Sequence, residues 1–157
     1  MKEEEKIMKT ENIKEQYILY ILVRNDLQSL NAGKAMAQAS HASNAFIKKH
    51  GHTKAAKEWA GETSQGFGTV IVLSVNKKQL DEAVHKCDVA DVVEDPTYPY
   101  IVNNEVASLI DPNHHTVAPI VKSDGTVVLH RKEITCAYVF GTKEECKPIV
   151  GHLPLHP

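Results

Sequence analysis

The chain has 157 residues, of which 42% are hydrophobic and 24% are charged, and its formal net charge is −2. This length and balance fit one compact globular domain, and they exclude a membrane-spanning helix, because no apolar run approaches the roughly 20 residues that a span needs. The three cysteines, Cys87, Cys136 and Cys146, lack C-x-x-C spacing and predict neither a disulfide framework nor a zinc site, so we expect free thiols in a cytoplasmic protein.

The first predicted elements are a charged tail and a buried strand. Residues 1–16 are rich in Lys and Glu, and they lack both apolar periodicity and the hydrophobic segment of a signal peptide. Residues 17–23, YILYILV, form a continuous apolar run that is too short for a buried helix and is typical of a central strand. We therefore expect a tail at 1–16, a single domain over 17–157, and a loop at 25–31 after the first strand.

Three helices are predicted by periodicity and by capping residues. Helical periodicity runs over 33–50, and Gly51 is expected to close that helix from the C′ position. Thr53 is expected to cap a second helix that ends near Ala60, and Asn76 to cap a third at 77–86.

Further strands are predicted at 69–75, 91–94 and 134–140, and a short final helix at 144–150 is limited by its proline. Ser123-Asp124-Gly125 lies between the strand-like stretches 116–121 and 126–130 and predicts a hairpin. Regular structure is expected to break between residues 95 and 120 at four prolines, Pro96, Pro99, Pro112 and Pro119. The alternation of strands and helices indicates a layered α/β fold.

The helix at 33–50 has two distinct faces when its residues are placed about 100° apart. The expected core face comprises Ala35, Met36, Ala39, Ala42, Ser43, Phe46 and Ile47. The expected outer face comprises Lys34, Gln38, His41, Ala45, Lys48 and Lys49. At the helix start, Gly33 lets a ligand approach the unpaired backbone amides and Lys34 adds a positive charge, so this end suits a phosphate or a developing oxyanion. The alternative is an ordinary solvated helix face.

Charge is distributed unevenly along the chain. The stretch from Lys34 to Lys57 contains lysines but no Asp or Glu, whereas the stretch from Asp81 to Asp95 is rich in acids. A protein with a small negative net charge can therefore present a local basic surface to an anionic partner such as nucleic acid. Two solvated surfaces of opposite sign are the alternative.

Two separated groups of motifs are shared with a known family. The first is Arg24-Asn25-Asp26-Leu27 followed by Gly33-Lys34-Ala35-Met36-Ala37-Gln38-Ala39-Ser40-His41-Ala42. The second is TCAYVFG at 135–141 with VGHL at 150–153. These stretches resemble the type-two peptidyl-tRNA hydrolases, in which a strand ends in R-x-D-L, a helix begins G-K-x-x-A-Q-x-x-H-A, and the chain ends in G-H-L. The resemblance covers about 17–95 and 133–155.

The resemblance implies a fold, an activity and a set of site residues. The implied fold is a three-layer α/β sandwich with a mixed central sheet of four or five strands flanked by helices, plus a β-hairpin inserted at about 100–132. The implied reaction is hydrolysis of the ester that joins a peptide to the 3′ ribose of tRNA. The candidates for catalysis are Lys34, His41, Asp95 and Thr135. The candidates for tRNA binding are Arg24, Asp26, Gly33, Gln38, Lys48 and Lys49. We expect tRNA as the partner, with no membrane, metal or cofactor, and a homodimer is left open.

The mechanism keeps several alternatives. Neutral His41 or ionised Asp95 could accept the proton of the attacking water, while Lys34 and the helix amides could stabilise the oxyanion. Thr135 could orient water or substrate. Arg24 and Asp26 are more simply explained as a structural ion pair at the edge of the site.

The sequence departs from the family pattern at two places. The loop at 28–32 is one residue longer and lacks a Lys that family members often carry, and Asp95 is followed by Pro96-Thr97-Tyr98-Pro99 in place of Ala-Gly-Arg-Thr. A non-catalytic relative that binds RNA or another anionic ligand through the same helix is therefore the main alternative to a hydrolase. A protein-interaction module that uses the 100–132 insertion is a third hypothesis.

Overall fold

The computed structural model describes residues 14–28, 30–102 and 120–157, in which strands and helices alternate. The strands are β1 (Tyr17–Arg24), β2 (Val70–Val75), β3 (Ala90–Val102), β4 (Ile120–Val121) and β5 (Val127–Thr142). The helices are α1 (Ala32–His50), α2 (Lys54–Ala60), α3 (Lys77–Lys86) and α5 (Lys143–Val150). Among these residues, none of the helices has the length and apolar character needed to cross a membrane.

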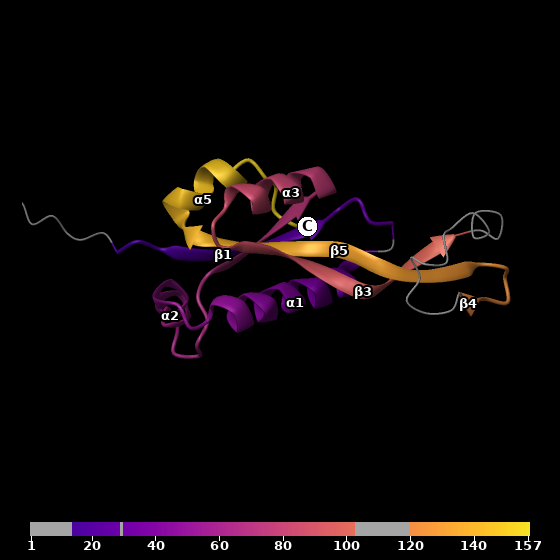
Figure 1. Cartoon of the computed structure of the whole chain (residues 1–157), viewed down its shortest axis with the longest axis horizontal. Coiled ribbons are helices and arrows are strands. Elements are labelled where there is room, and N and C mark those ends of the chain that lie inside the picture. Colours follow the sequence, from indigo (N-terminus) through magenta and orange to yellow (C-terminus); the bar gives the residue numbers. More distant parts are fainter. Residues whose placement is uncertain (1–13, 29, 103–119) are drawn as a thin grey trace, which may run out of the picture.

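A mixed sheet forms the middle layer of the molecule. Its strand order is β2-β1-β5-β3, with β4 paired to β5 off this path. The β1–β2 pair is parallel, and the other pairs are antiparallel. Helices α1 and α2 cover one face, and α3 and α5 cover the other (Figure 1). The predicted α/β fold with a mixed sheet is confirmed.

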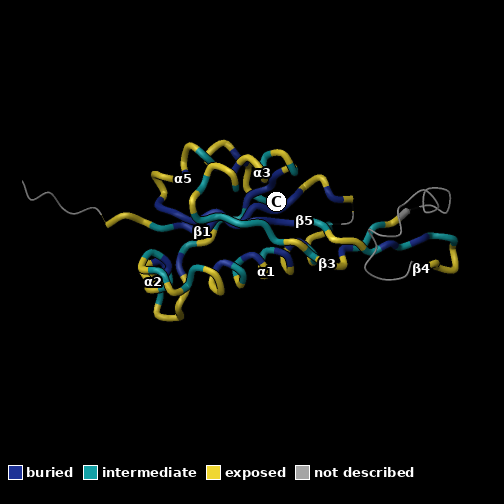
Figure 2. The backbone as a smooth tube through the Cα atoms, viewed as in Figure 1, coloured by how far each residue is buried: buried dark blue, intermediate teal, exposed yellow. Residues whose placement is uncertain are grey.

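Strand β1 is buried on both faces, which explains its continuous apolar sequence. Leu19, Ile21 and Val23 belong to the core beneath α1 and α2. The alternate residues Ile18, Tyr20 and Leu22 belong to the core beneath α3 and α5. Buried residues are accordingly concentrated along β1 and the second half of β5 (Figure 2).

The capping residues act largely as predicted. The Thr53 side chain accepts from the Ala56 amide at the start of α2, and Asn76 forms a capping box with Gln79 at the start of α3. Asn31, which the sequence placed in a loop, caps α1 by accepting from the amide of Lys34. These caps fix where each helix begins.

Gly51 ends α1, but not in the left-handed conformation typical of a C′ glycine. Its φ is −59°, and its amide donates to the carbonyl of Ile47. A Cβ at this position would lie 2.4 Å from that carbonyl oxygen. Glycine is needed here because of close backbone approach rather than because of handedness.

The predicted core face of α1 is rotated relative to the observed one. The buried residues of the helix are Ala35, Gln38, Ala42 and Phe46. Met36 and Ile47, expected in the core, are 70% and 44% exposed, whereas Gln38, expected outside, is 5% exposed. The helix turns its small residues and its one hydrogen-bonded glutamine toward the sheet, a choice that hydrophobic periodicity alone does not reveal.

The expected break in regular structure after residue 95 is wrong for two of the four prolines. Strand β3 continues through Pro96 and Pro99 to Val102, and Pro99 is paired in register with His130 of β5. Strand β3 is an edge strand, where a residue without an N–H group is tolerated. Pro112 and Pro119 lie outside the described residues.

The ends of β3 and β5 extend past the helices as a narrow ribbon to which β4 is added (Figure 1). The predicted hairpin turn joins β4 to β5, with the Lys122 amide donating to the Thr126 carbonyl over 2.8 Å. Gly125 has a φ of +84°, a conformation that favours glycine. Residues 116–119 of the predicted hairpin and 1–13 of the predicted tail lie outside the described residues.

Candidate functional site

A buried chain of hydrogen bonds joins β5, α1 and β3. The Thr135 hydroxyl donates to Oε1 of Gln38 over 2.6 Å, and Nε2 of Gln38 donates to Oδ2 of Asp95 over 2.9 Å. Thr135 is fully buried and Gln38 nearly so. Because a carboxylate only accepts hydrogen bonds, the amide of Gln38 can satisfy both neighbours in one orientation only. The structure thus brings together three residues that the sequence had proposed separately.

Two bulges in the β3–β5 pair create this arrangement. Val93 pairs with Cys136 but Glu94 pairs with Ile134, so Thr135 is an extra residue on β5. On the other side of Asp95, two β3 residues, Pro96 and Thr97, oppose one residue of β5. Bulges redirect side chains, and here they bracket both Thr135 and Asp95.

Asp95 is held by hydrogen bonds to both of its carboxylate oxygens. Its Oδ2 atom accepts from Gln38, and its Oδ1 atom accepts from the amide of Thr97 over 2.9 Å. The latter contact is a local turn typical of Asp. The side chain is only half-buried, so a fixed carboxylate faces the surface at the bulge.

Lys34 lies one helical turn before Gln38 and faces the same side of α1. Its Nζ atom is 5.9 Å from the centre of the Tyr98 ring, which is buried on β3 just past the second bulge. This distance is within the range of a cation–π interaction. Lys34 lies on α1 and Asp95 on β3, and the hydrogen bond from Gln38 to Asp95 connects these two elements.

The remaining α1 candidates are exposed. His41, Gly33 and Lys48 are exposed, and in the described part of the chain the side chains of His41 and Lys48 have no hydrogen-bond or ion-pair partner. Lys49 pairs with Asp91 over 2.7 Å on the surface. His41 lies on the Lys34 side of the helix, about two turns further on, but no contact joins it to Asp95.

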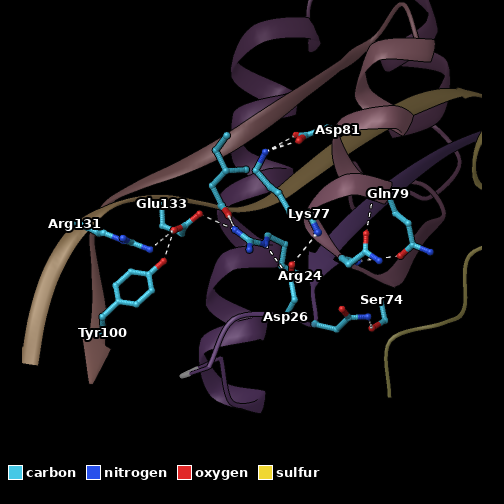
Figure 3. A network of polar contacts seen from close by, with 12 residues as sticks. Arg24, Asp26, Ser74, Lys77, Gln79, Asp81, Tyr100, Arg131 and Glu133 are labelled. Carbon is cyan, nitrogen blue, oxygen red and sulfur yellow. Dashed lines mark hydrogen bonds and ion pairs between the residues drawn. The ribbon is translucent and has the colours of Figure 1, made fainter. Parts of the chain in front are cut away.

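Arg24 lies in a second network beside the first (Figure 3). Its Nε atom contacts Asp26 over 2.8 Å, and its Nη1 atom contacts Glu133 over 2.7 Å and the Ile134 carbonyl over 2.9 Å. The hydrogen bond from Arg24 is the main cause that lowers the pKa of Asp26 below its ordinary value. The structural pairing of Arg24 with Asp26, proposed from sequence as the alternative to tRNA binding, is present.

The same network reaches the ribbon and α3. The Tyr100 hydroxyl donates to Glu133, and the Arg131 guanidinium stacks 3.9 Å from the Tyr100 ring centre. The second oxygen of Asp26 accepts from the Lys77 amide at the start of α3. Glu133, which sequence reasoning missed, is paired in register with Asp95 and so lies where the two networks adjoin.

Sequence reasoning also missed Tyr98 and Tyr100. Their spacing of two residues places both side chains on one face of β3, and their rings meet at 5.5 Å. The alternation of Tyr98 and Tyr100 is a signal for a strand, but the neighbouring Pro96 and Pro99 predict a break in regular structure.

The site combines a fixed carboxylate, a lysine at the start of a helix and a buried threonine on a three-layer α/β scaffold. A model of the family described as "Peptidyl-tRNA hydrolase PTH2" matches residues 17–156, including the ribbon that the sequence motifs leave uncovered. The chain belongs to the PTH2 peptidyl-tRNA hydrolase family.

Two other comparisons add context. A solved structure of a protein of unknown function from Agrobacterium tumefaciens is similar over 90% of this chain and 98% of that chain, with a TM-score of 0.46 and 10% sequence identity. A search among curated proteins found no significant match.

Proposed function

We propose that the protein hydrolyses the ester bond of peptidyl-tRNA, releasing the peptide and free tRNA. The observation that carries this proposal is the Thr135–Gln38–Asp95 chain, which fixes a carboxylate beside the helix that begins with Gly33 and Lys34. Membership of the PTH2 family supports the same reaction.

Asp95 is the proposed acceptor of the water proton. Gln38 and Thr97 each donate to one carboxylate oxygen, and each oxygen keeps a further lone pair for a water molecule. A carboxylate held in this way can orient the water and accept its proton as the water attacks the ester carbonyl. His41 is the second candidate, but no side chain among the described residues orients its ring.

Thr135 is proposed to act through Gln38 rather than on substrate. Its hydroxyl is fully buried and donates to Gln38, so it does not face a bound ester. By fixing the amide of Gln38 it fixes the carboxylate of Asp95. Thr135 and Gln38 are therefore positioning residues in this proposal.

The start of α1 is proposed to stabilise the negative oxygen that forms during attack. The Asn31 side chain accepts a hydrogen bond from the Lys34 amide at the start of α1. The amides of the exposed residues Ala32 and Gly33 have no partner among the described residues. These amides and the Lys34 ammonium supply donors of the kind that stabilise an oxyanion by about 3 kcal/mol each when well placed. The cation–π contact with the buried Tyr98 ring restrains the position of the Lys34 ammonium.

Phosphate contacts are proposed for the exposed cations on the same side of α1. Lys48 has no ion-pair partner among the described residues, and Lys49 can exchange its surface contact with Asp91 for a phosphate. Such contacts make tRNA binding weaken as salt concentration rises. Arg24 and Asp26 support the strand ends in this account instead of contacting tRNA.

The proposal is tested with labelled N-acetylaminoacyl-tRNA in parallel hydrolysis and filter-binding assays. A hydrolase releases the N-acetylated amino acid in a time-dependent reaction that increases with protein concentration. Retention of the intact tRNA on the filter without release would instead identify a non-catalytic RNA-binding relative. If the protein gives no release of the amino acid and no salt-dependent retention of tRNA, both the hydrolase and the RNA-binding relative are excluded.

A further inference from the structure

Two thiols line one cavity, which also borders Tyr17 of β1 and Ala55 of α2. The cavity has a volume of about 500 Å³, and Cys87 and Cys146 both line it, with Lys86 and Glu145 beside them. Cys87 ends α3, and Cys146 lies inside α5. The two helices therefore bring together cysteines that are far apart in the sequence.

The two sulfur atoms lie against consecutive residues of β5. Sγ of Cys87 is 3.6 Å from the carbonyl oxygen of Phe140, and Sγ of Cys146 lies 3.0 Å from where a Cβ on Gly141 would stand. The Cys87 thiol also donates to the carbonyl oxygen of Val89 over 3.5 Å. Glycine at 141 leaves the space that the Cys146 sulfur occupies.

The two thiols differ in accessibility and acidity. Cys87 is half-buried, whereas Cys146 is 1% exposed. The Cys146 side chain is the main cause that lowers the pKa of Cys87, and the same interaction raises the pKa of Cys146. A cysteine reacts as its thiolate and only where the oxidant can reach it, so the more exposed Cys87 is the thiol that reacts first. Burial raises the pKa of Cys136, the third cysteine, to about 12.

We propose that Cys87 and Cys146 form a peroxide-sensitive pair that closes to an intramolecular disulfide between α3 and α5. The Cys87 thiolate attacks one peroxide oxygen, the O–O bond breaks, and Cys87 becomes a sulfenic acid while the other oxygen leaves and takes up a proton as water or an alcohol. The Cys146 sulfur then attacks the Cys87 sulfur. The S–O bond breaks, the hydroxide leaves with the Cys146 proton as water, and the two sulfurs have together given two electrons to the peroxide.

The disulfide would leave the candidate site intact. Helices α3 and α5 cover the face of the sheet opposite α1 (Figure 1). Neither cysteine contacts Gln38, Asp95 or Thr135. Oxidation should therefore stabilise the fold by closing a long loop without changing the site.

The experiment uses the full chain, reduced, freed of reductant and treated with hydrogen peroxide. The protein is then denatured and alkylated with N-ethylmaleimide, and the alkylated thiols are counted by intact mass and located by peptide mapping. The wild type has three cysteines and should retain one alkylated thiol, at Cys136, with a Cys87–Cys146 disulfide and a raised melting temperature. Cys136→Ser, the matched control, should retain none.

Two single variants separate the roles within the pair. Cys146→Ser should accumulate a dimedone-reactive sulfenic acid at Cys87, whereas Cys87→Ser should keep both remaining thiols after the same treatment. Far-ultraviolet circular dichroism checks that each variant is folded, and a serine variant that is not folded is replaced by alanine at the same position. Three alkylated thiols in oxidised wild type, a disulfide that contains Cys136, or a disulfide between chains would overturn the proposal.

Discussion

The side-chain amide of Gln38 donates to the carboxylate of Asp95 over 2.9 Å, which ties the first turns of α1 to a bulge in the edge strand β3. On its other side, Oε1 of Gln38 accepts a hydrogen bond from the Thr135 hydroxyl. The orientation of the half-buried Asp95 carboxylate therefore depends on two buried side chains, and the site should be sensitive to changes beneath its surface.

Thr135→Val tests this dependence. The substitution removes the hydroxyl with little change in shape and leaves Oε1 of Gln38 buried without its partner, a loss of about 1–3 kcal/mol in the free energy of unfolding. Turnover should fall as well, because Asp95 loses its support. Thr135→Ser keeps the hydroxyl and should retain most of both properties. Urea unfolding measures the stability and the hydrolysis assay measures the turnover. Equal turnover in the Val variant and the wild type would show that Thr135 has no positioning role in the site.

Lys34→Ala tests the cationic start of α1. Turnover should fall at least about tenfold, because a well-placed donor to the oxyanion contributes on the order of 3 kcal/mol. Lys48→Ala is the matched control on the same side of the helix, and it should weaken tRNA binding and reduce its salt dependence while leaving turnover at saturating substrate nearly unchanged. A Lys34→Ala variant with wild-type turnover would show that this ammonium does not act in the reaction.

The order of elements and their caps could be predicted from sequence because these signals are local. Thr53 and Asn76 accept from amides only three residues away. The packing direction of α1 could not be predicted so simply. Gln38 counts as polar in any periodicity, yet it is buried, because Thr135 and Asp95, distant in sequence, satisfy its amide.

Arg24→Met tests the second network. Among the described residues, the substitution leaves Glu133 with its Tyr100 and Arg131 contacts in a largely buried position, and it should lower the free energy of unfolding by on the order of 3 kcal/mol. Lys49→Ala removes an exposed ion pair and should leave stability nearly unchanged. Chemical unfolding of both variants gives the comparison, and similar small losses in the two would contradict a structural role for Arg24.

His50 should make stability depend on pH near neutrality. Burial is the main cause that lowers the pKa of His50 from its ordinary value of 6.5, and the ring contacts the Tyr138 hydroxyl at 3.1 Å. The folded protein then binds the proton less readily than the unfolded chain, so this contribution to stability is complete above the ordinary pKa and is lost as pH falls through the lowered one.

His50→Gln provides the measurement of that contribution. Between about pH 7 and pH 5, the melting temperature of the wild type should fall more than that of the variant. His52→Gln changes an exposed neighbouring ring and should follow the wild-type profile. Parallel profiles for wild type and His50→Gln would show that His50 does not couple folding to protonation.

The bulges could not be predicted because they depend on long-range register. The resemblance identifies Asp95 and Thr135, but their meeting requires one extra residue on β5 and then one extra residue on β3. The prolines that suggested an end to regular structure lie in an edge strand, where they interrupt pairing with only one neighbour. The neighbours Glu133 and Tyr100 became visible only once β3 and β5 were aligned.

The most direct measurement is the single-turnover rate of N-acetylaminoacyl-tRNA hydrolysis by the wild type and by Asp95→Asn, with Glu94→Gln as the exposed neighbouring control. The wild type and the control should cleave the ester at similar rates, and Asp95→Asn should be slower by roughly a hundredfold or more, as expected for loss of a general base. An inactive wild type, or an Asp95→Asn variant that cleaves as fast as the wild type, would contradict the proposal that this carboxylate activates the attacking water.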